Sequence, residues 1–195
     1  AAYRRIDRNV NPDTREIKIS DYDEITFVGS ADFGYEQSDK APYLSVTIDE
    51  NLFDYLVTEV EGGTLKIYPK SIKKGFNNNS YDLRPTVYKI KSNSKELKEL
   101  NTVGSGSFII SKPTKGNRME IKMAGRGNVE LRGPVKGYKL ECNMAGSGNI
   151  IAKDIQLDNL SCSLASSGEI EVIGTVDRAS FNVAGSGEIK AFDCQ

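Results

Sequence analysis

Two pairs of polar side chains recur at one position of a repeated motif, and they are the residues best able to carry chemistry. Asn128 and Asn149 hold this position in two successive repeats, and Glu169 and Glu188 hold it in the next two. If the repeats stack, the two amides can exchange hydrogen bonds along the stack. The two carboxylates would be like charges on neighbouring strands, able to share a cation or to turn apart into water. A hard cation takes six or more oxygen ligands and this pair supplies at most four, so we predict no metal site.

Catalytic chemistry finds little support in the composition. The 195 residues include no His and no Trp, which removes the commonest acid–base residue, the commonest metal ligand and the best aromatic surface for a sugar. β-Helical enzymes that cut polysaccharides use carboxylate pairs on one long face, but no Asp-rich signature marks such a pair here. Glu120, Glu141, Arg118 and Lys139 are expected to form a solvated face. We therefore assign no catalytic residue and no cofactor.

The charge is balanced, with 26 basic and 27 acidic residues and a net charge of −1. No basic surplus favours nucleic acid or anionic membranes as partners. No apolar run approaches the roughly 18 residues of a membrane span, so we predict no transmembrane segment. The chain begins at Ala1 without a signal peptide, and a removed leader would leave no trace.

The polar pairs belong to a motif that occurs five times, at residues 102–109, 123–130, 144–151, 164–171 and 183–190. The first turn residues of the copies lie 21, 21, 20 and 19 residues apart. A period near 20 indicates a solenoid, whose repeats bury their apolar faces by stacking. Glycines are expected to form its corners, because they tolerate positive φ and close stacking. The corner glycines are Gly104, Gly106, Gly125, Gly127, Gly146, Gly148, Gly168, Gly185 and Gly187.

Apolar and polar residues alternate on both sides of each corner, which is the periodicity of strands. A leucine-rich repeat has a similar period, but its usual Asn and its helical half are missing. The pattern favours an all-β chain folded as a right-handed parallel β-helix with about 20 residues per coil. Its interior should contain a column of Val129, Ile150, Ile170 and Ile189. Residues 101–195 form the five regular coils of this prediction.

The N-terminal half is less regular. Residues 1–24 are expected to be an extension with a first strand, and residues 25–33 look like a sixth corner that lies 75 residues before Gly104. That distance leaves room for three or four degenerate coils within residues 25–100. Asp49 can cap a short helix over about 49–60, with Leu52, Phe53, Leu56, Val57 and Val60 on one face. Residues 71–85 read as a long surface loop that carries Phe76 and Tyr81, either a ligand-facing loop or a passive insertion.

Two further expectations concern thiols and ends. Cys142 and Cys162 should lie one coil apart in one inward column, near enough for a disulfide but with poor torsion, so we predict buried free thiols.

Only eight residues follow Gly187, which leaves the last coil without an evident cap. Self-association through the C-terminal coil, a neighbouring domain, or Phe192 folded back over the core would cover it.

Three parts of the sequence together resemble a bacterial family, the head GIN domain of putative auto-transporter adhesins. They are residues 25–37, residues 48–68 and the string of A-G-S-G-(N/E)-I corners, and the resemblance covers about 16–192. It implies an exported protein of the bacterial cell envelope or exterior with a β-helical fold, and it supplies no catalytic residues. The chain departs from the pattern at Arg126, where most repeats have Ser, and at Ser166, where they have Gly.

These observations favour a non-catalytic, adhesin-like interaction protein that presents a flat β-helix face to a glycan or protein. The alternative is a polysaccharide-active enzyme or a small-ligand or lipid-binding protein. A cleft with converging carboxylates and an aromatic side chain would favour the alternative.

Overall fold

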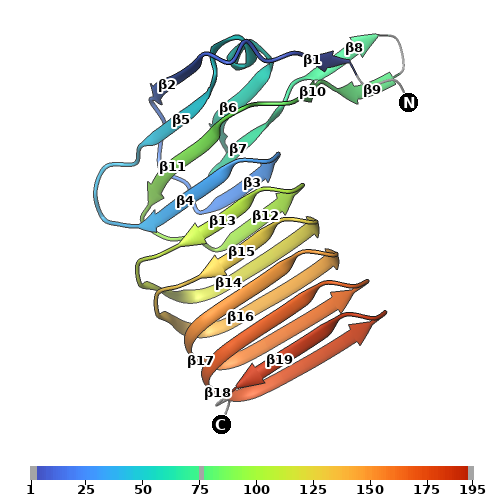
Figure 1. The fold of residues 1–195 in the computed structure, drawn as a ribbon. Helices are drawn as coiled ribbons and strands as arrows, with labels where there is room; N and C mark the ends of the chain where they lie inside the picture. The colour runs from blue at the N-terminus through green and yellow to red at the C-terminus, as the bar shows by residue number, and fades with distance from the viewer. Residues whose placement is uncertain (1–3, 75–76, 193–195) are drawn as a thin grey trace.

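The computed structural model describes residues 4–74 and 77–192, and its strands stack into one elongated column (Figure 1). Phe76, which entered the expectations above, lies outside these residues. The elements are β1 (Arg5–Ile6), β2 (Pro12–Ile17), β3 (Glu24–Val28), β4 (Asp32–Gln37), β5 (Leu44–Asp49), η1 (Glu50–Tyr55), β6 (Leu56–Glu61), β7 (Thr64–Pro69), β8 (Ser71–Lys74), β9 (Asn77–Ser80), β10 (Asp82–Leu83), β11 (Tyr88–Ser94), β12 (Glu99–Val103), β13 (Ser107–Ile110), β14 (Thr114–Gly125), β15 (Asn128–Leu131), β16 (Val135–Gly146), β17 (Asn149–Ala165), β18 (Glu169–Ala184) and β19 (Glu188–Phe192).

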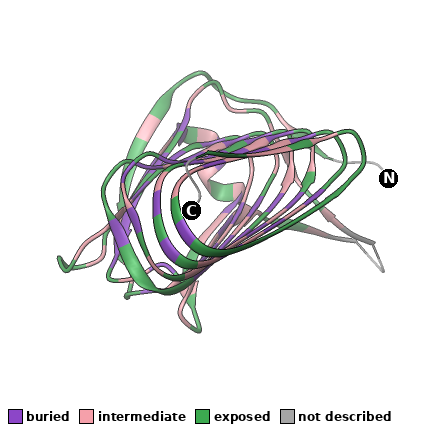
Figure 2. Ribbon diagram, turned by 90° about the horizontal axis from the view of Figure 1, so that it is seen from below, coloured by how far each residue is buried: buried purple, intermediate pink, exposed green. Residues whose placement is uncertain are grey.

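The predicted parallel β-helix is confirmed. Each coil contributes one strand to a long sheet, turns at a corner, and contributes a second strand to a short sheet. The long sheet stacks β3, β12, β14 and the later parts of β16, β17 and β18 in parallel register. The short sheet stacks β4, β13, β15, the first parts of β17 and β18, and β19. Seen along the axis, the coils superpose on one elongated ring (Figure 2).

The predicted interior column is present. Val129 pairs with Ile150, Ile150 with Ile170 and Ile170 with Ile189, and the first three of these side chains are fully buried. Cys142 and Cys162 also pair in one inward column, and both are free and buried, as predicted. Alternation of apolar residues therefore gives the correct inward face along these strands.

The predicted three or four degenerate coils between the first two corners are wrong. β12 pairs directly with β3, and β13 pairs with β4, so the coil that turns at Gly29 touches the coil that turns at Gly104. The intervening chain supplies one coil, formed by β7 and β11, and this coil stacks on the opposite side of β3 and β4. The order of coils along the axis thus differs from their order in the sequence.

The predicted helix over 49–60 is wrong in extent and type. η1 is a 3₁₀ helix of six residues, and β6 then pairs antiparallel with β7. Gly62 and Gly63 both have positive φ (57° and 78°), which suits the two-residue turn of a hairpin and selects this pairing over a helix. Asp49 makes no side-chain cap; its buried carboxylate accepts hydrogen bonds from the Thr86 amide instead, at 3.0 and 3.1 Å.

The predicted loop over 71–85 contains regular structure. β8 and β9 form an antiparallel hairpin, and β10 pairs in parallel with β1 near the chain start. The sequence did not indicate these strands, because the segment contains polar turn formers such as the Asn run and has little apolar alternation.

Antiparallel strands close the N-terminal end of the column. β5 pairs with β11, β2 pairs with β5, and β6 pairs with β7, so the parallel edges there are covered. Leu52 of η1 is fully buried beneath this cap. Covered edges protect a sheet from pairing with other chains.

The core changes character along the axis. Aromatic rings fill the N-terminal coils, where Phe33 lies 4.7 Å from Phe108 and 5.6 Å from Phe27, measured between ring centroids. Aliphatic and sulfur side chains such as Met144 and Cys142 fill the regular coils. At the last coil, Phe181 and Val183 continue the columns of Cys162 and Leu164 but are 44% and 43% exposed.

Candidate functional site

The long sheet carries two outward columns of residues just before the corners, one of small apolar side chains and one of polar side chains. The small apolar column consists of Val28, Val103, Ala124, Ala145, Ala165 and Ala184, and the polar column of Thr26, Asn101, Lys122, Asn143, Ser163 and Asn182. Small side chains beside longer ones leave a shallow depression that follows the axis. We call this depression the trough.

Two hollows lie along the trough. One of about 370 Å³ covers the coils from Val103 to Ala184. A second of about 580 Å³ begins at Thr26 and Val28. Because the strands pair in register from Val28 to Ala184, the two hollows share the same columns. With about 4.8 Å between neighbouring strands, the six coils of the trough span roughly 24 Å.

Aromatic and charged side chains form the wall at the N-terminal end of the trough. Tyr68, Tyr81, Asp82 and Arg84 line the second hollow together with the outward side chains of β3. The Tyr81 ring packs edge-on against Tyr55 at 4.9 Å between centroids, which fixes its orientation. A tyrosine combines a large apolar face with a hydroxyl that donates and accepts hydrogen bonds.

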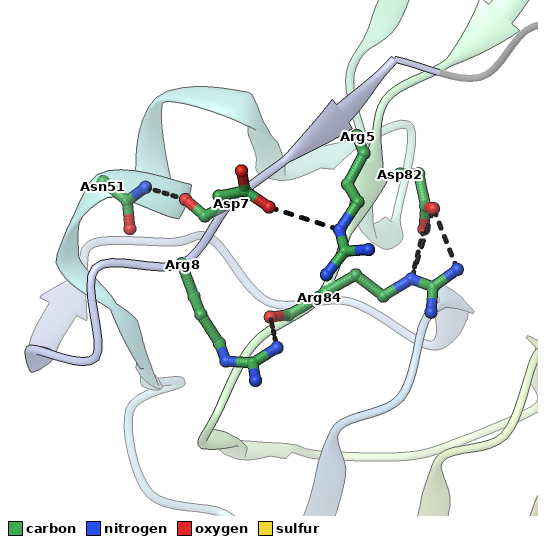
Figure 3. A network of polar contacts seen from close by, with 6 residues as sticks. All are labelled: Arg5, Asp7, Arg8, Asn51, Asp82 and Arg84. Atoms are coloured by element: carbon green, nitrogen blue, oxygen red, sulfur yellow. Dashed lines mark hydrogen bonds and ion pairs between the residues drawn. The ribbon is translucent and has the colours of Figure 1, made fainter.

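A network of polar contacts ties this wall to the start of the chain (Figure 3). The Arg84 guanidinium binds the Asp82 carboxylate at 3.1 Å, and the Arg84 carbonyl accepts a hydrogen bond from Arg8. Asp7 forms an ion pair with Arg5 and accepts a hydrogen bond at its carbonyl from Asn51 of η1. Segments distant in sequence therefore hold β10 and its side chains in place.

The predicted ladder at the corners divides into two parts. The Asn149 amide donates a hydrogen bond to the Asn128 side-chain oxygen at 3.1 Å. Glu169 and Glu188 pair in register, and Lys190 lies 3.0 Å from the first carboxylate and 3.9 Å from the second. The cation between these like charges is thus a lysine of the same chain, a partner that the sequence reading did not consider.

Other carboxylates of the solenoid faces are paired in the same way. Glu130 of the short sheet contacts Arg132 and Lys153, both at 3.1 Å. The Arg132 guanidinium, hydrogen-bonded to it, holds the pKa of the Glu130 carboxyl below its ordinary value. Beside the trough, Lys122 lies 3.0 Å from Glu99 and 3.5 Å from Glu120. Ion pairing favours the charged carboxylate, whereas a general acid needs the protonated form.

The corner residues bring backbones into close contact. Gly104, Gly125, Gly146 and Gly185 have positive φ between 107° and 128°, and Ser166 adopts a φ of 90° at the equivalent place. A Cβ atom on Gly146 would lie 2.8 Å from the backbone nitrogen of Gly125. The second corner glycines Gly106, Gly127, Gly148, Gly168 and Gly187 would also bring a Cβ within 2.7 Å or less of a carbonyl oxygen of the preceding coil.

The sequence reading missed the trough as a site. The small apolar column is visible in the repeats as the residue before each corner, Ala124, Ala145, Ala165 and Ala184, but the sequence alone does not show that it borders a depression. The contribution of Tyr68, Tyr81 and Arg84 could not be found in this way, because it depends on how the insertion between β4 and β12 folds back. Within residues 4–74 and 77–192, no group of three or more His, Cys, Asp or Glu could hold a metal ion. In the same residues, no helix has the length and apolar character needed to cross a membrane.

Comparison with known proteins relates this geometry to a family. Among curated proteins, none matches the chain. A solved structure from Parabacteroides distasonis, described as a putative lipid binding protein, is 96% identical, with a TM-score of 0.96 over 98% of this chain and 78% of that one. A putative adhesin from the same species is 29% identical, with a TM-score of 0.86 over 99% of this chain and 77% of that one.

A more distant structure shows the same fold. It is a putative adhesin from Parabacteroides merdae, 24% identical, with a TM-score of 0.62 over 96% of this chain and 99% of that one. The family model of the putative auto-transporter adhesin, head GIN domain, matches residues 21–133 and 124–195. The chain therefore belongs to the head GIN domain family of putative auto-transporter adhesins.

Proposed function

We propose that the protein is a non-catalytic surface interaction protein that binds an extended glycan along the trough. The observation that carries this proposal is the trough itself, whose two columns run in register across six coils from Val28 to Ala184. A linear polymer can meet equivalent side chains at each coil, so many weak contacts add up along its length.

The chemistry of the walls suits a sugar chain. The polar column offers amides, hydroxyls and one lysine, groups that donate and accept hydrogen bonds as sugar hydroxyls do. The small apolar column lets a ring approach the strands, and Tyr81 supplies an aromatic face at one end. A protein ligand would use the same broad face, but the narrow polar column favours a thin polymer over a wide partner.

A binding role agrees with the pairing of the charges. Two of the carboxylates beside the trough, Glu99 and Glu120, are ion-paired with Lys122. Acid–base cleavage of a glycan requires two carboxyl groups in different protonation states on either side of the bond. The family name supports an exported protein of the cell envelope or exterior, and we propose that location.

A lipid ligand is the second candidate. One structure 96% identical to this chain is described as a putative lipid binding protein. The last coil offers apolar side chains for such a ligand, because Phe181 and Val183 are 44% and 43% exposed. This surface lies at the end of the column, whereas the trough lies along its side.

A glycan array followed by calorimetry tests the proposal. Ala145→Phe fills the middle of the trough, and Thr175→Phe adds the same ring at an exposed position outside it. We expect the first variant to weaken glycan binding about tenfold or more and the second to leave it within about twofold. Equal affinity of both variants would exclude the trough. Vesicle binding that is lost in Phe181→Ser and retained in Ala145→Phe would support the lipid candidate instead.

A further inference from the structure

Another cavity, apart from the two hollows of the trough, lies at the opposite ends of the long-sheet strands. It has a volume of about 460 Å³, within the range of small-ligand sites. Its wall combines the loop after β4 with the starts of β14 and β16. Lys95, Lys115 and Lys136 all line it, together with Pro113 and Pro134. We call it the basic pocket.

The frame of the basic pocket is fixed by one side chain. The Gln37 amide donates hydrogen bonds to the carbonyls of Lys95 and Lys115, both at 2.9 Å. The Gln37 side-chain oxygen accepts a hydrogen bond from the Lys115 amide at 2.7 Å. One carboxamide thus joins the backbones that carry two of the three lysines.

The loop that forms the rim is also held in place. The Ser38 amide donates to the Ser94 carbonyl at 2.9 Å. The buried Asn93 side chain accepts a hydrogen bond from the Tyr43 amide at 2.8 Å and lies 3.3 Å from the Ala41 carbonyl, to which it donates. These bonds hold both ends of the loop 38–43, of which Ser38 and Asp39 line the pocket.

The charge of the basic pocket is not neutralised by its own wall. Lys115 and Lys136 pair in register on neighbouring strands, where like charges are destabilising. Neither these two nor Lys95 forms an ion pair with any residue of the described parts of the chain. The wall itself carries one carboxylate, Asp39, against three lysines; Glu96 lines an adjoining hollow, and the Asp21 carboxylate accepts a hydrogen bond from the Lys95 amide at 3.3 Å.

We propose that the basic pocket binds an oxyanion group, a sulfate, carboxylate or phosphate, carried by a saccharide. Three ammonium groups around one cavity provide strong donors for such an anion. The proline rings give the wall an apolar surface against which a sugar ring packs. A membrane surface is disfavoured because the lysines surround a cavity and no aromatic side chain is among the residues that line it. This site is separate from the trough and does not depend on the proposed function.

Titration calorimetry with a sulfated hexasaccharide tests the basic pocket. Lys115→Gln/Lys136→Gln removes two charges from it. Lys89→Gln/Lys91→Gln is the matched control, because it removes two exposed lysines of β11 that form no ion pair with described residues. We expect the dissociation constant to rise about tenfold in the first variant and less than about twofold in the control. Equal melting temperatures of both variants and the parent establish that the fold is retained.

Further arms identify the source of the anion. The basic pocket should bind the sulfated hexasaccharide and, more weakly, inorganic sulfate, and should not bind an uncharged dextran oligosaccharide of equal length. Equal losses in the two double variants would overturn the proposal, because binding would then follow net charge alone. Binding to phosphatidylglycerol vesicles without binding to the hexasaccharide would also overturn it in favour of a lipid headgroup. Ala145→Phe should leave hexasaccharide binding at this site unchanged, so that failure here is distinguishable from failure of the trough.

Discussion

The Gly104 backbone lies directly on the Gly29 backbone, although 75 residues separate them. A Cβ atom on Gly104 would lie 2.6 Å from the Gly29 carbonyl oxygen, and that oxygen accepts a hydrogen bond from the Gly106 amide at 3.1 Å. The corner of the first coil is therefore continuous with the corners of the regular coils, and the long insertion leaves the stack without a gap.

The stacked corners predict that adding a side chain to a corner glycine lowers the stability of the protein. Gly146→Ala should lower the free energy of unfolding by about 1–3 kcal/mol, because φ is 128° and the added Cβ would meet the Gly125 backbone. Gly34→Ala is the control, since the nearest atom to its added Cβ is 4.0 Å away. Chemical denaturation measures both. Equal stability of the two variants would contradict the stacked-corner geometry.

The one non-glycine among the first corner residues predicts a stabilising change. Ser166 has a φ of 90°, a region that costs a side chain about 1–2 kcal/mol. Ser166→Gly should therefore raise the midpoint of unfolding, after part of the gain is offset by backbone entropy. Ser167→Gly, next in sequence and without positive φ, should lower it. A lower midpoint for Ser166→Gly would show that its side chain contributes contacts that outweigh the strain.

Buried tyrosines predict how stability changes at high pH. Burial raises the pKa of Tyr35 to about 12, against the opposing effect of its hydrogen bond to Ser94, and burial also raises the pKa of Tyr22 and Tyr88. The fold favours the neutral phenols, so this stabilisation is complete below pH 10, the ordinary tyrosine pKa, and is lost as pH rises through about 12.

Tyrosinate absorbance checks the tyrosine prediction. We expect the buried tyrosines to ionise together with unfolding, whereas the nine tyrosines of the denatured chain should ionise in one step near pH 10. Ionisation of all tyrosines near pH 10 in a chain that stays folded would contradict the burial of the phenols.

The two free cysteines that face each other on neighbouring strands should be chemically inert in the folded protein. Cys142 and Cys162 are buried, and the contact with the Cys162 side chain together with burial raises the pKa of the Cys142 thiol. A thiol-reactive reagent should label neither residue under native conditions and both after denaturation without reductant. Mass spectrometry of the two peptides measures this. Unlabelled cysteines in the denatured, unreduced chain would instead reveal a disulfide.

The exposed inner side chains of the last coil predict self-association of this 195-residue chain. Phe181 is 44% exposed at a position whose column partner, Cys162, is buried. Sedimentation over a wide concentration range should show a reversible larger species that Phe181→Ser removes. Tyr138→Ser is the control, because Tyr138 is 43% exposed on the side of the column. A parent that stays monomeric throughout would exclude this association.

Local patterns predicted the regular coils because the apolar alternation and the corner glycines indicated the same fold. The alternation around Val129 and Ile150 set the inward faces, and the glycines between them set the corners. The failures came from pairings between distant segments. Leu56–Glu61 carries helix-compatible spacing but becomes a strand because β7 and the Gly62–Gly63 turn select it.

The candidate sites also differ in whether local patterns or contacts between distant segments form them. The Asn128–Asn149 contact follows from stacking alone. The ion pairs of Lys190 with Glu169 and Glu188 were not predicted. Lys190 lies two residues beyond Glu188, and its position beside Glu169 depends on the register of the paired strands. The basic pocket joins Gln37 to Lys115, 78 residues apart, so no local pattern could indicate it.

The order of the coils in space imposes an order on folding. β3 and β4 leave the ribosome early, yet their neighbours on one side are β7 and β11 and on the other β12 and β13. They cannot acquire both neighbours until the chain has been synthesised to Ile110, which is more than half of its length. Partners in the regular coils lie about 20 residues apart, so their loops close at lower entropic cost. The C-terminal coils are thus suited to nucleate the column, and we expect the aromatic end that the chain begins with to become native last.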